Sequence, residues 1–527
     1  MASNNDASTK GWWEPVQYRF RHLPIHLALL RTGKVLAFGG SGNDEANPTP
    51  YPAEIWDPQT GEVRSIEQPL EGDIFCSGHS FLSDGRLLVA GGTHMYDGKL
   101  MVFGFNLPPF RGLEQTYIFD PVVESWSRVQ DMGTGRWYPT LVTLGDSRVV
   151  AMAGLMKHFP WAFLRRVEIY TDGRGWQPFD GAHRWLPLYP RLHLLPSGDI
   201  FYSGSFNTHY TFPFTLKAFP TGILHVQKAS WRTIGPPVRA QREEGASVLL
   251  PLAPPQYAPR VVLIGGGSPG GTQAVADTEL IDLSEASPTW RTIQPMKHAR
   301  YHVYTVLLPN RQLLVVGGRS GDKEHARRPD VGRPGVEPPE VAVAAEFRVP
   351  HDPLAVLEAE LFDPDTKAWT PMASMSVDRL YHSNALLLPD GRVMTAGSNA
   401  ARRINELRIE IYHPPYLFKG PRPEIQSAPA AVSYGEDIEI RTAGTHAIDE
   451  VALIRPSATT HGLDTDQRYV GLGIRTAEAG RTVARIPENA HVAPPGYYML
   501  FIVRGGIPSK ARFVRLFSEE DILQPAH

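Results

Sequence analysis

A short motif recurs seven times along this 527-residue chain, and it constrains the fold more than any other feature. Each copy has a polar turn, then four or five apolar residues that favour β-strands, then a pair of small residues. The copies read GKVLAFGG, GRLLVAGG, SRVVAMAG, GDIFYSG, RVVLIGGG, RQLLVVGG and GRVMTAG, and the second small residues are Gly40, Gly92, Gly154, Gly204, Gly266, Gly318 and Gly397. Most copies are roughly 50 to 60 residues apart, which is the kelch period and predicts a seven-bladed β-propeller.

A second motif follows most of the glycine pairs in phase. It is an apolar or aromatic strand that ends in Asp-Pro or a variant, usually followed by a tryptophan: AEIWDPQTGEV, YIFDPVVESW, VEIYTDGRGW, ELIDLSEASPTW and AELFDPDTKAW. These segments are expected to form the outer strands of four-stranded blades, with the 48 glycines and 48 prolines supplying the many turns. The fold class predicted is therefore all-β.

The domain organisation follows from where the repeat starts and stops. Residues 1–16 precede it as an N-terminal tail, and residues 17–417 form the propeller. A charged, proline-rich stretch at 319–350 lacks strand periodicity and is interpreted as an inserted surface loop. Residues 418–527 have alternating strands at the spacing of an immunoglobulin-like β-sandwich.

Composition excludes several classes of function. A net charge of −3 gives no electrostatic footprint for nucleic acid, and no apolar run reaches the roughly 18 residues of a membrane segment. The single cysteine excludes an internal disulfide. The N-terminus has no export signal, which leaves the compartment open. Nothing in the sequence demands an oligomer, so a monomer is expected.

Five residues stand out as candidates for chemistry. Cys76 in FCSG and Tyr138 in RWYP occupy equivalent points at the heads of successive blades, and Tyr381 and His382 in RLYHS head a later one. His461 lies in a polar turn of the C-terminal domain. Each has a purely structural interpretation: a lone cysteine is usually a small buried apolar residue, and the pair Tyr301 and His302 repeats the Tyr-His motif one blade earlier.

Taken together and in order, the motifs resemble those of the galactose oxidase and glyoxal oxidase family of copper radical oxidases. FCSG, RWYP, RLYHS, PPYLF, THGLDTDQR and PPGYYMLFIV span nearly the whole chain, and RWYP is closer to the glyoxal oxidase branch. The resemblance implies one copper ion held by Tyr138, Tyr381, His382 and His461. It also implies a radical cofactor made by joining Tyr138 to the sulfur of Cys76.

The implied reaction oxidises a small-molecule primary alcohol, or a hydrated aldehyde, with O₂ as acceptor and hydrogen peroxide as product. In it Tyr381 is the general base, and Tyr138 with Cys76 is the redox group. Nitrogen and oxygen ligands suit Cu(II), and no sulfur cluster competes for the metal. The resemblance also suggests a secreted or cell-envelope protein.

The sequence departs from the family at one point and leaves an alternative open. Galactose oxidase shields its modified tyrosine with a tryptophan, and the aligned position here is Met156, with His158, Phe159 and Trp161 nearby. The alternative function is a non-catalytic kelch-type propeller that binds protein or carbohydrate. Such a scaffold would be expected to lose the five residues independently, and all five are present.

Overall fold

The computed structural model describes most of the chain. The described residues are 4–42, 44, 51–66, 70–96, 101–102, 105–106, 110–157, 164–207, 220–239, 242–268, 273–321, 351–399, 405–444 and 446–517. The expected insert at 319–350 therefore lies outside them from residue 322 onward. Within the described part of the chain, none of the helices has the length and hydropathy needed to cross a bilayer.

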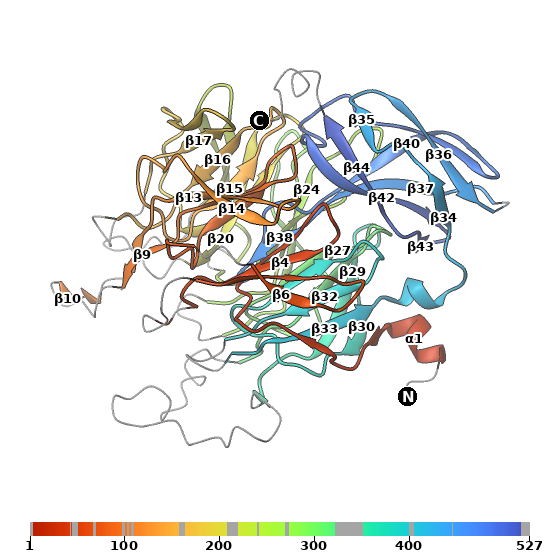
Figure 1. Ribbon diagram of the computed structural model, residues 1–527, viewed down its shortest axis with the longest axis horizontal. Helices are drawn as coiled ribbons and strands as arrows, with labels where there is room; N and C mark the ends of the chain where they lie inside the picture. The colour runs from red at the N-terminus through yellow and green to blue at the C-terminus, as the bar shows by residue number, and fades with distance from the viewer. Residues whose placement is uncertain are drawn as a thin grey trace.

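Seven antiparallel sheets form the blades of a β-propeller, as the repeat predicted (Figure 1). Blade 1 contains β3 (His26–Leu29), β4 (Val35–Phe38), β5 (Ala53–Trp56) and β6 (Val63–Ser65). Blade 2 contains β7 (Gly78–Phe81), β8 (Leu87–Ala90), β13 (Thr116–Asp120) and β14 (Ser125–Val129). Blade 3 contains β15 (Thr140–Thr143), β16 (Val149–Met152), β17 (Glu168–Thr171) and β18 (Gly175–Pro178). Blade 4 contains β19 (Leu188–Leu194), β20 (Ile200–Asn207), β21 (Thr221–His225) and β22 (Ser230–Gly235).

The remaining blades repeat the pattern. Blade 5 contains β23 (Ala246–Leu249), β24 (Arg260–Ile264), β25 (Thr278–Asp282) and β26 (Arg291–Ile293). Blade 6 contains β27 (Tyr304–Leu307), β28 (Leu313–Val316), β29 (Glu358–Asp363) and β30 (Ala368–Ser374). Blade 7 contains β31 (Asn384–Leu387), β32 (Val393–Ala396) and β33 (Arg408–His413). Short ribbons extend blade 2: β9 (Thr93–Tyr96) pairs with β12 (Phe110–Gly112), and β10 (Met101–Val102) with β11 (Phe105–Asn106).

The two ends of the repeat meet in blade 7. The N-terminal strands β1 (Trp12–Trp13) and β2 (Tyr18–Arg19) pair with β33, with Trp13 opposite Tyr412. Residues 12 and 13, assigned to the tail on sequence, thus supply the outer strand of the last blade. The helix α1 (Asn4–Lys10) precedes them. Pairing the first segment of the array with the last one closes the ring of blades.

In four blades a buried ion pair fixes the segment that comes just before the first, innermost strand. An arginine there pairs with a glutamate from the third strand of the same blade: Arg136 with Glu168 at 2.8 Å, Arg242 with Glu279 at 2.5 Å, Arg300 with Glu360 at 2.6 Å and Arg379 with Glu410 at 4.0 Å. The arginines also donate to backbone carbonyls, as Arg136 does to Ala153 and Arg300 to Gly317. Removing one partner from such a pair would leave a charge buried, so these arginines fix the loops that enter the propeller axis.

The C-terminal domain is an immunoglobulin-like set of strands in one curled sheet. It contains β34 (Glu424–Ser427), β35 (Ala431–Ser433), β36 (Asp437–Ala443), β37 (Glu450–Arg455), β40 (Arg468–Glu478), β41 (Arg481–Arg485), β42 (Gly496–Arg504), β43 (Ile507–Pro508) and β44 (Arg512–Phe517). A short 3₁₀ helix, η2 (Pro415–Phe418), links it to the propeller. A hairpin of β38 (Ala458–Thr460) and β39 (Leu463–Asp464) leaves this domain and pairs with β3, so β38 lies among the propeller strands (Figure 1).

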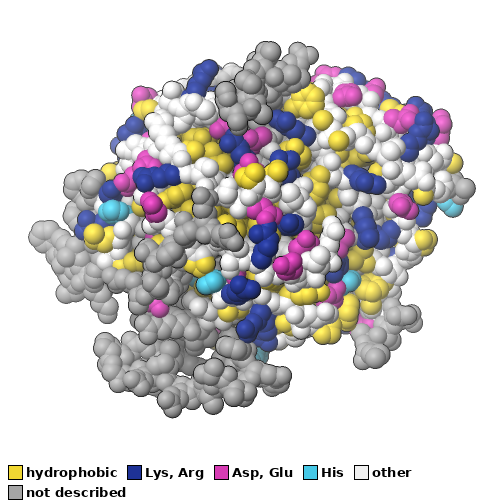
Figure 2. All heavy atoms as spheres, viewed as in Figure 1, with side chains coloured by type: hydrophobic (Ala, Val, Ile, Leu, Met, Phe, Trp, Pro, Cys, Tyr) yellow, Lys and Arg dark blue, Asp and Glu magenta, His cyan; other side chains and the backbone are white. Residues whose placement is uncertain are grey.

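Basic and acidic side chains are interspersed over the face of the molecule shown in Figure 2. The chemistry-bearing residues lie inside, where the hairpin meets the inner strands.

Candidate metal and redox centre

Three of the five candidate residues come from equivalent points in different blades. Cys76, Tyr138 and His382 each stand two residues ahead of an inner strand, in blades 2, 3 and 7. All three have a left-handed backbone, with φ of 61°, 63° and 63°. This conformation is uncommon for residues with a side chain, and it turns the side chain away from the direction that the strand would impose. The repeat therefore aims all three toward the propeller axis.

The C-terminal hairpin brings the fourth residue to the same place. His461 occupies the tip between β38 and β39, also with positive φ, at 50°. Gly462 follows it, and a Cβ there would lie 2.5 Å from the carbonyl oxygen of Val303 in blade 6. Arg191 of blade 4 donates to the His461 carbonyl at 3.4 Å. The tip is thus held by contacts from blades 4 and 6.

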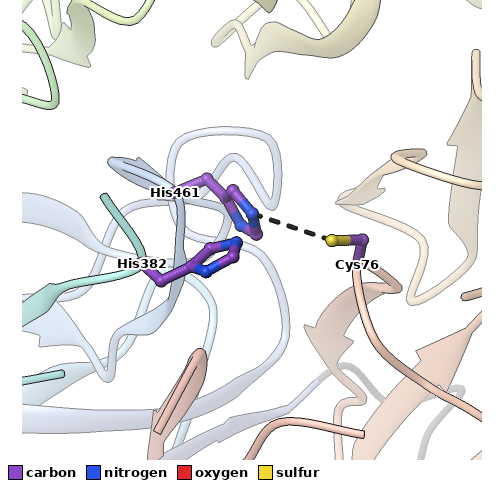
Figure 3. A group of neighbouring side chains, drawn as sticks. All are labelled: Cys76, His382 and His461. Carbon is purple, nitrogen blue, oxygen red and sulfur yellow. Dashed lines mark hydrogen bonds between the residues drawn. The ribbon is translucent and has the colours of Figure 1, made fainter. Parts of the chain in front are cut away.

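The functional groups of these residues converge. The Tyr138 Oη lies 2.6 Å from the Tyr381 Oη and 3.0 Å from the His461 Nε2. The Cys76 Sγ lies 3.7 Å from the same nitrogen (Figure 3). Cys76, His382 and His461 offer ligand atoms that all lie within 4.8 Å of one another, with the cysteine on one side and the two imidazoles on the other (Figure 3). Four of the five are buried, and Tyr381 is half-buried.

The tautomer of His461 follows from its neighbour. The Thr460 hydroxyl donates to the carbonyl of Ile25 at 3.0 Å and lies 2.6 Å from the His461 Nδ1. Because the hydroxyl has one hydrogen and gives it to Ile25, its oxygen accepts the hydrogen of Nδ1. Nε2 then carries a lone pair directed at Tyr138 and Cys76. A second ring nitrogen held in this way is the usual support of a metal-binding histidine.

His382 has two ring nitrogens that no described residue satisfies. It is fully buried, and neither nitrogen has a hydrogen-bond partner among the described residues, as is also true of His26 and His79. Burial, reinforced by the neighbouring histidines, lowers the pKa of both His382 and His461 well below the usual value, so both stay neutral and able to bind a metal. Buried polar atoms are rarely left unpaired, and a metal ion would satisfy this one. Two imidazoles with two phenols form a nitrogen and oxygen set that fits Cu(II).

The Tyr138 phenol and the Cys76 thiol are both shielded from water. Burial raises the pKa of the Tyr138 phenol and of the Cys76 thiol well above their usual values. Both therefore hold their protons until a bound cation, the largest charge such a site would contain, draws them off.

Two aromatic rings cover Tyr138. Trp137 stacks on it with ring centroids 4.0 Å apart, and Tyr189 of blade 4 stacks on it at 4.3 Å. Phe110 stacks on Trp137 at 4.2 Å and extends the column. Among the described residues these rings stand where a shield was expected from Met156 or its neighbours; Met156 is half-buried and His158, Phe159 and Trp161 lie outside the described residues.

The structure thus brings together all five residues singled out on sequence: Cys76, Tyr138, Tyr381, His382 and His461. Sequence reasoning missed Thr460, Trp137 and Tyr189. Trp137 was within the quoted RWYP motif, and Tyr189 occupies the same repeat position in blade 4 as Tyr138 in blade 3. Alignment of the blades on that position would have found Tyr189.

Comparison with known proteins gives the same family in both domains. The model of the glyoxal oxidase N-terminus matches residues 52–353, and that of the galactose oxidase-like Early set domain matches residues 422–516. Aldehyde oxidase GLOX of Vitis pseudoreticulata is 30% identical over 504 residues, covering 88% of this chain and 85% of that protein. Galactose oxidase of Gibberella zeae is 26% identical over 525 residues, covering 92% and 67%.

A solved structure supports the fold independently. A fungal alcohol oxidase of the AA5 family, in complex with copper, superimposes with a TM-score of 0.77 at 23% identity, covering 96% of this chain and all of the other.

Proposed function

The chain belongs to the glyoxal oxidase and galactose oxidase family, and from this premise we propose that it is a copper radical oxidase. It takes two hydrogens from a primary alcohol or a hydrated aldehyde and passes them to O₂. The products are an aldehyde or a carboxylic acid, together with hydrogen peroxide, and the reaction balances without any other reactant. The relatives named aldehyde oxidase and galactose oxidase support an oxidoreductase that acts on alcohol or aldehyde groups.

One observation carries the proposal. The Tyr138 Oη lies 2.6 Å from the Tyr381 Oη and 3.0 Å from the Nε2 of His461, and Cys76 lies in the same cluster. Thr460 orients the His461 ring through its other nitrogen. A structural cluster of this kind would leave His382 with two buried, unpaired nitrogens. A metal site gives every one of these groups a role.

Tyr138, Tyr381, His382 and His461 would hold the copper. A bound copper ion supplies a Lewis-acidic position for the substrate oxygen and accepts one electron, while a thioether between Cys76 and Tyr138 lets Tyr138 give up and regain the other. The rings of Trp137 and Tyr189 keep water from both faces of Tyr138. Thr460 holds the His461 Nδ1 hydrogen so that Nε2 faces the site.

Tyr381 is suited to be the general base. Its phenol lies within hydrogen-bond distance of Tyr138, and it is the most exposed of the five residues, so a substrate reaches it first. A base must lie within direct reach of the proton that it removes. The Tyr381 Oη would take the hydroxyl proton of the bound substrate.

The proposal is tested by loading the full chain with copper in air and examining its peptides by mass spectrometry. We expect a loss of two hydrogens that joins the Cys76 peptide to the Tyr138 peptide, and no such link in metal-free protein. Tyr138→Phe should prevent the link and lower peroxide production on every substrate by about 10⁴-fold or more, because the redox group acts as a unit with the metal.

The matched control is Tyr189→Phe, which keeps a ring stacked on Tyr138 and removes a hydroxyl that donates to the Ser77 carbonyl and also contacts Thr460. It should form the link. Two unmodified peptides in wild-type protein with copper bound would overturn the radical proposal and favour a binding scaffold.

A further inference from the structure

The repeat presents more side chains to the axis than the copper site uses. Among the described residues, six blades have a left-handed residue at the position that carries Cys76 and Tyr138, with φ between 42° and 63°. They are Cys76, Tyr138, Tyr189, Glu244, His302 and His382. Cys76, Tyr138 and His382 belong to the proposed copper site, and Tyr189 stacks on Tyr138. Glu244 and His302, from the neighbouring blades 5 and 6, have no role in it.

Glu244 and His302 form a buried pair. The Glu244 Oε2 lies 3.3 Å from the His302 Nδ1, and the His302 backbone NH donates to the Glu244 carbonyl at 2.9 Å. Glu244 is 2% exposed and His302 7% exposed. Placing a carboxylate in this setting is costly unless a partner or a ligand compensates it. A carboxylate behind a histidine also orients the ring, as Thr460 does for His461.

The pair lies beside the half-buried member of the site. The His302 ring lies 5.3 Å from the Tyr381 ring, centroid to centroid. Tyr381 is the half-buried member of the site, and His302 keeps some exposure beside it. A substrate bound at Tyr381 would therefore lie close to His302.

We propose that Glu244 and His302 form a substrate-positioning dyad that binds the second hydroxyl of a hydrated aldehyde. This inference rests on the proposed function and specifies its substrate class. The Glu244 carboxylate, 3.3 Å from Nδ1, favours the tautomer of His302 that carries its hydrogen on that nitrogen, so Nε2 on the other side of the ring would accept a hydrogen bond from the substrate. One hydroxyl of the geminal diol gives its proton to Tyr381, and the other donates to His302. A simple primary alcohol has no second hydroxyl on the reacting carbon, so it gains nothing from the dyad.

The expected size of the effect follows from the type of bond. A hydrogen bond to a charge-supported acceptor in a buried site corresponds to about 10- to 100-fold in affinity. Sites built to bind a hydroxyl discriminate strongly against analogues that lack it. The dyad should thus separate hydrated aldehydes from alcohols of the same carbon skeleton.

The test uses two ligands that cannot react, because their central carbon has no hydrogen: trifluoroacetone hydrate, and its analogue with one hydroxyl replaced by methyl. Fluorine NMR on copper-loaded full-length protein measures both dissociation constants. We expect wild type to bind the hydrate at least about tenfold more tightly than the analogue. His302→Gln and Glu244→Gln should bring the two constants together, and His302→Asn offers a smaller replacement should glutamine not fit.

The matched control is His193→Gln, the same substitution at a half-buried histidine that hydrogen-bonds Ser247 and lines a separate cavity of about 60 Å³. It should retain the wild-type preference. In turnover, kcat/KM for acetaldehyde should fall in the dyad variants while that for ethanol stays within about twofold.

An equal preference for the hydrate in wild type and in both dyad variants would overturn the dyad and make it a structural ion pair. The Cys76–Tyr138 link is read separately on the same samples. If the link is absent, while wild type prefers the hydrate and the dyad variants do not, the radical mechanism is rejected and the dyad is supported.

Discussion

Two sides of the propeller axis use one backbone position for opposite purposes. On one side, the sealed arc, Cys76, Tyr138 and Tyr189 of blades 2 to 4 are apolar or aromatic and stack closely. On the other, the polar arc, Glu244 and His302 of blades 5 and 6 form a charge-bearing pair next to the half-buried Tyr381. The φ angles of these five residues all lie between 42° and 63°.

The difference shows how a repeat fold divides labour within one site. A left-handed residue with a side chain costs of order 1 kcal/mol or more, and the surrounding structure must enforce it. The buried arginine–glutamate pairs supply that enforcement in blades 3 and 5 to 7. Because the blade holds the backbone, the side chain is free to vary. The sealed arc carries aromatic rings that exclude water, and the polar arc carries hydrogen-bonding groups that we propose contact the substrate.

The hairpin between the arcs should affect both of them alike. Thr460→Val removes the acceptor that holds the His461 Nδ1 hydrogen. Loss of such a support typically lowers metal affinity or activity by about 10- to 100-fold. We expect copper affinity, measured by competition with a chelator, to fall by this factor, and the ratio of aldehyde to alcohol turnover to stay constant.

The adjacent threonine gives a matched control. Thr459 is also buried on β38, and in the described part of the chain its hydroxyl has no hydrogen-bond partner. Thr459→Val should leave copper affinity unchanged. An equal loss in both variants would mean that the hairpin responds to any substitution and that the Thr460 bond has no special role.

Burial on the sealed arc also makes the protein sensitive to acid. His79 follows Cys76 on β7, is fully buried, and has its pKa lowered to about 3 by that burial. Below pH 6.5, the pKa of about 6.5 in the unfolded chain means that His79 is protonated there, whereas His79 in the folded protein stays neutral. The free energy of unfolding should therefore fall from pH 6.5 downward, by about 2 kcal/mol at pH 5 for this residue.

His79→Gln removes this titration. Urea unfolding at pH 8 and pH 5 should show the variant gaining about 2 kcal/mol on wild type between the two conditions. A constant difference between His79→Gln and wild type would show that this histidine does not set the acid limit.

The sequence predicted most of the scaffold because the scaffold is periodic. Glycine pairs at the kelch spacing located all seven blades, and the family motifs located Cys76, Tyr138, Tyr381, His382 and His461. Pairing between segments far apart in the chain could not be predicted from the sequence, because Trp13 pairs with Tyr412 only once the ring of blades closes. The Glu244–His302 pair was missed because neither residue lies in a family motif, although the Tyr301–His302 pair had been noted as a repeat of the ligand motif.

From the sequence, the ring that shields Tyr138 was expected at Met156 or in the residues after it, because alignment with the family transfers only a position in the chain. Stacking depends instead on which rings the fold brings together. Trp137 precedes Tyr138 in the chain, and Tyr189 comes from the next blade. Their stacking makes the sealed arc a column of rings that includes Phe110.

The smallest expected effect tests that column. Trp137→Leu removes one stacked face of Tyr138 and up to about 1.5 kcal/mol of ring interaction, which corresponds to at most about tenfold in kcat. The visible absorption of the oxidised protein should shift and fade faster in air, since water then reaches the ring. Phe110→Leu, which alters the far end of the column without contacting Tyr138 in any stacked pair, should leave the spectrum unchanged. Equal fading in the two variants would show that the column acts as general packing, and that the sealed arc protects Tyr138 by burial alone.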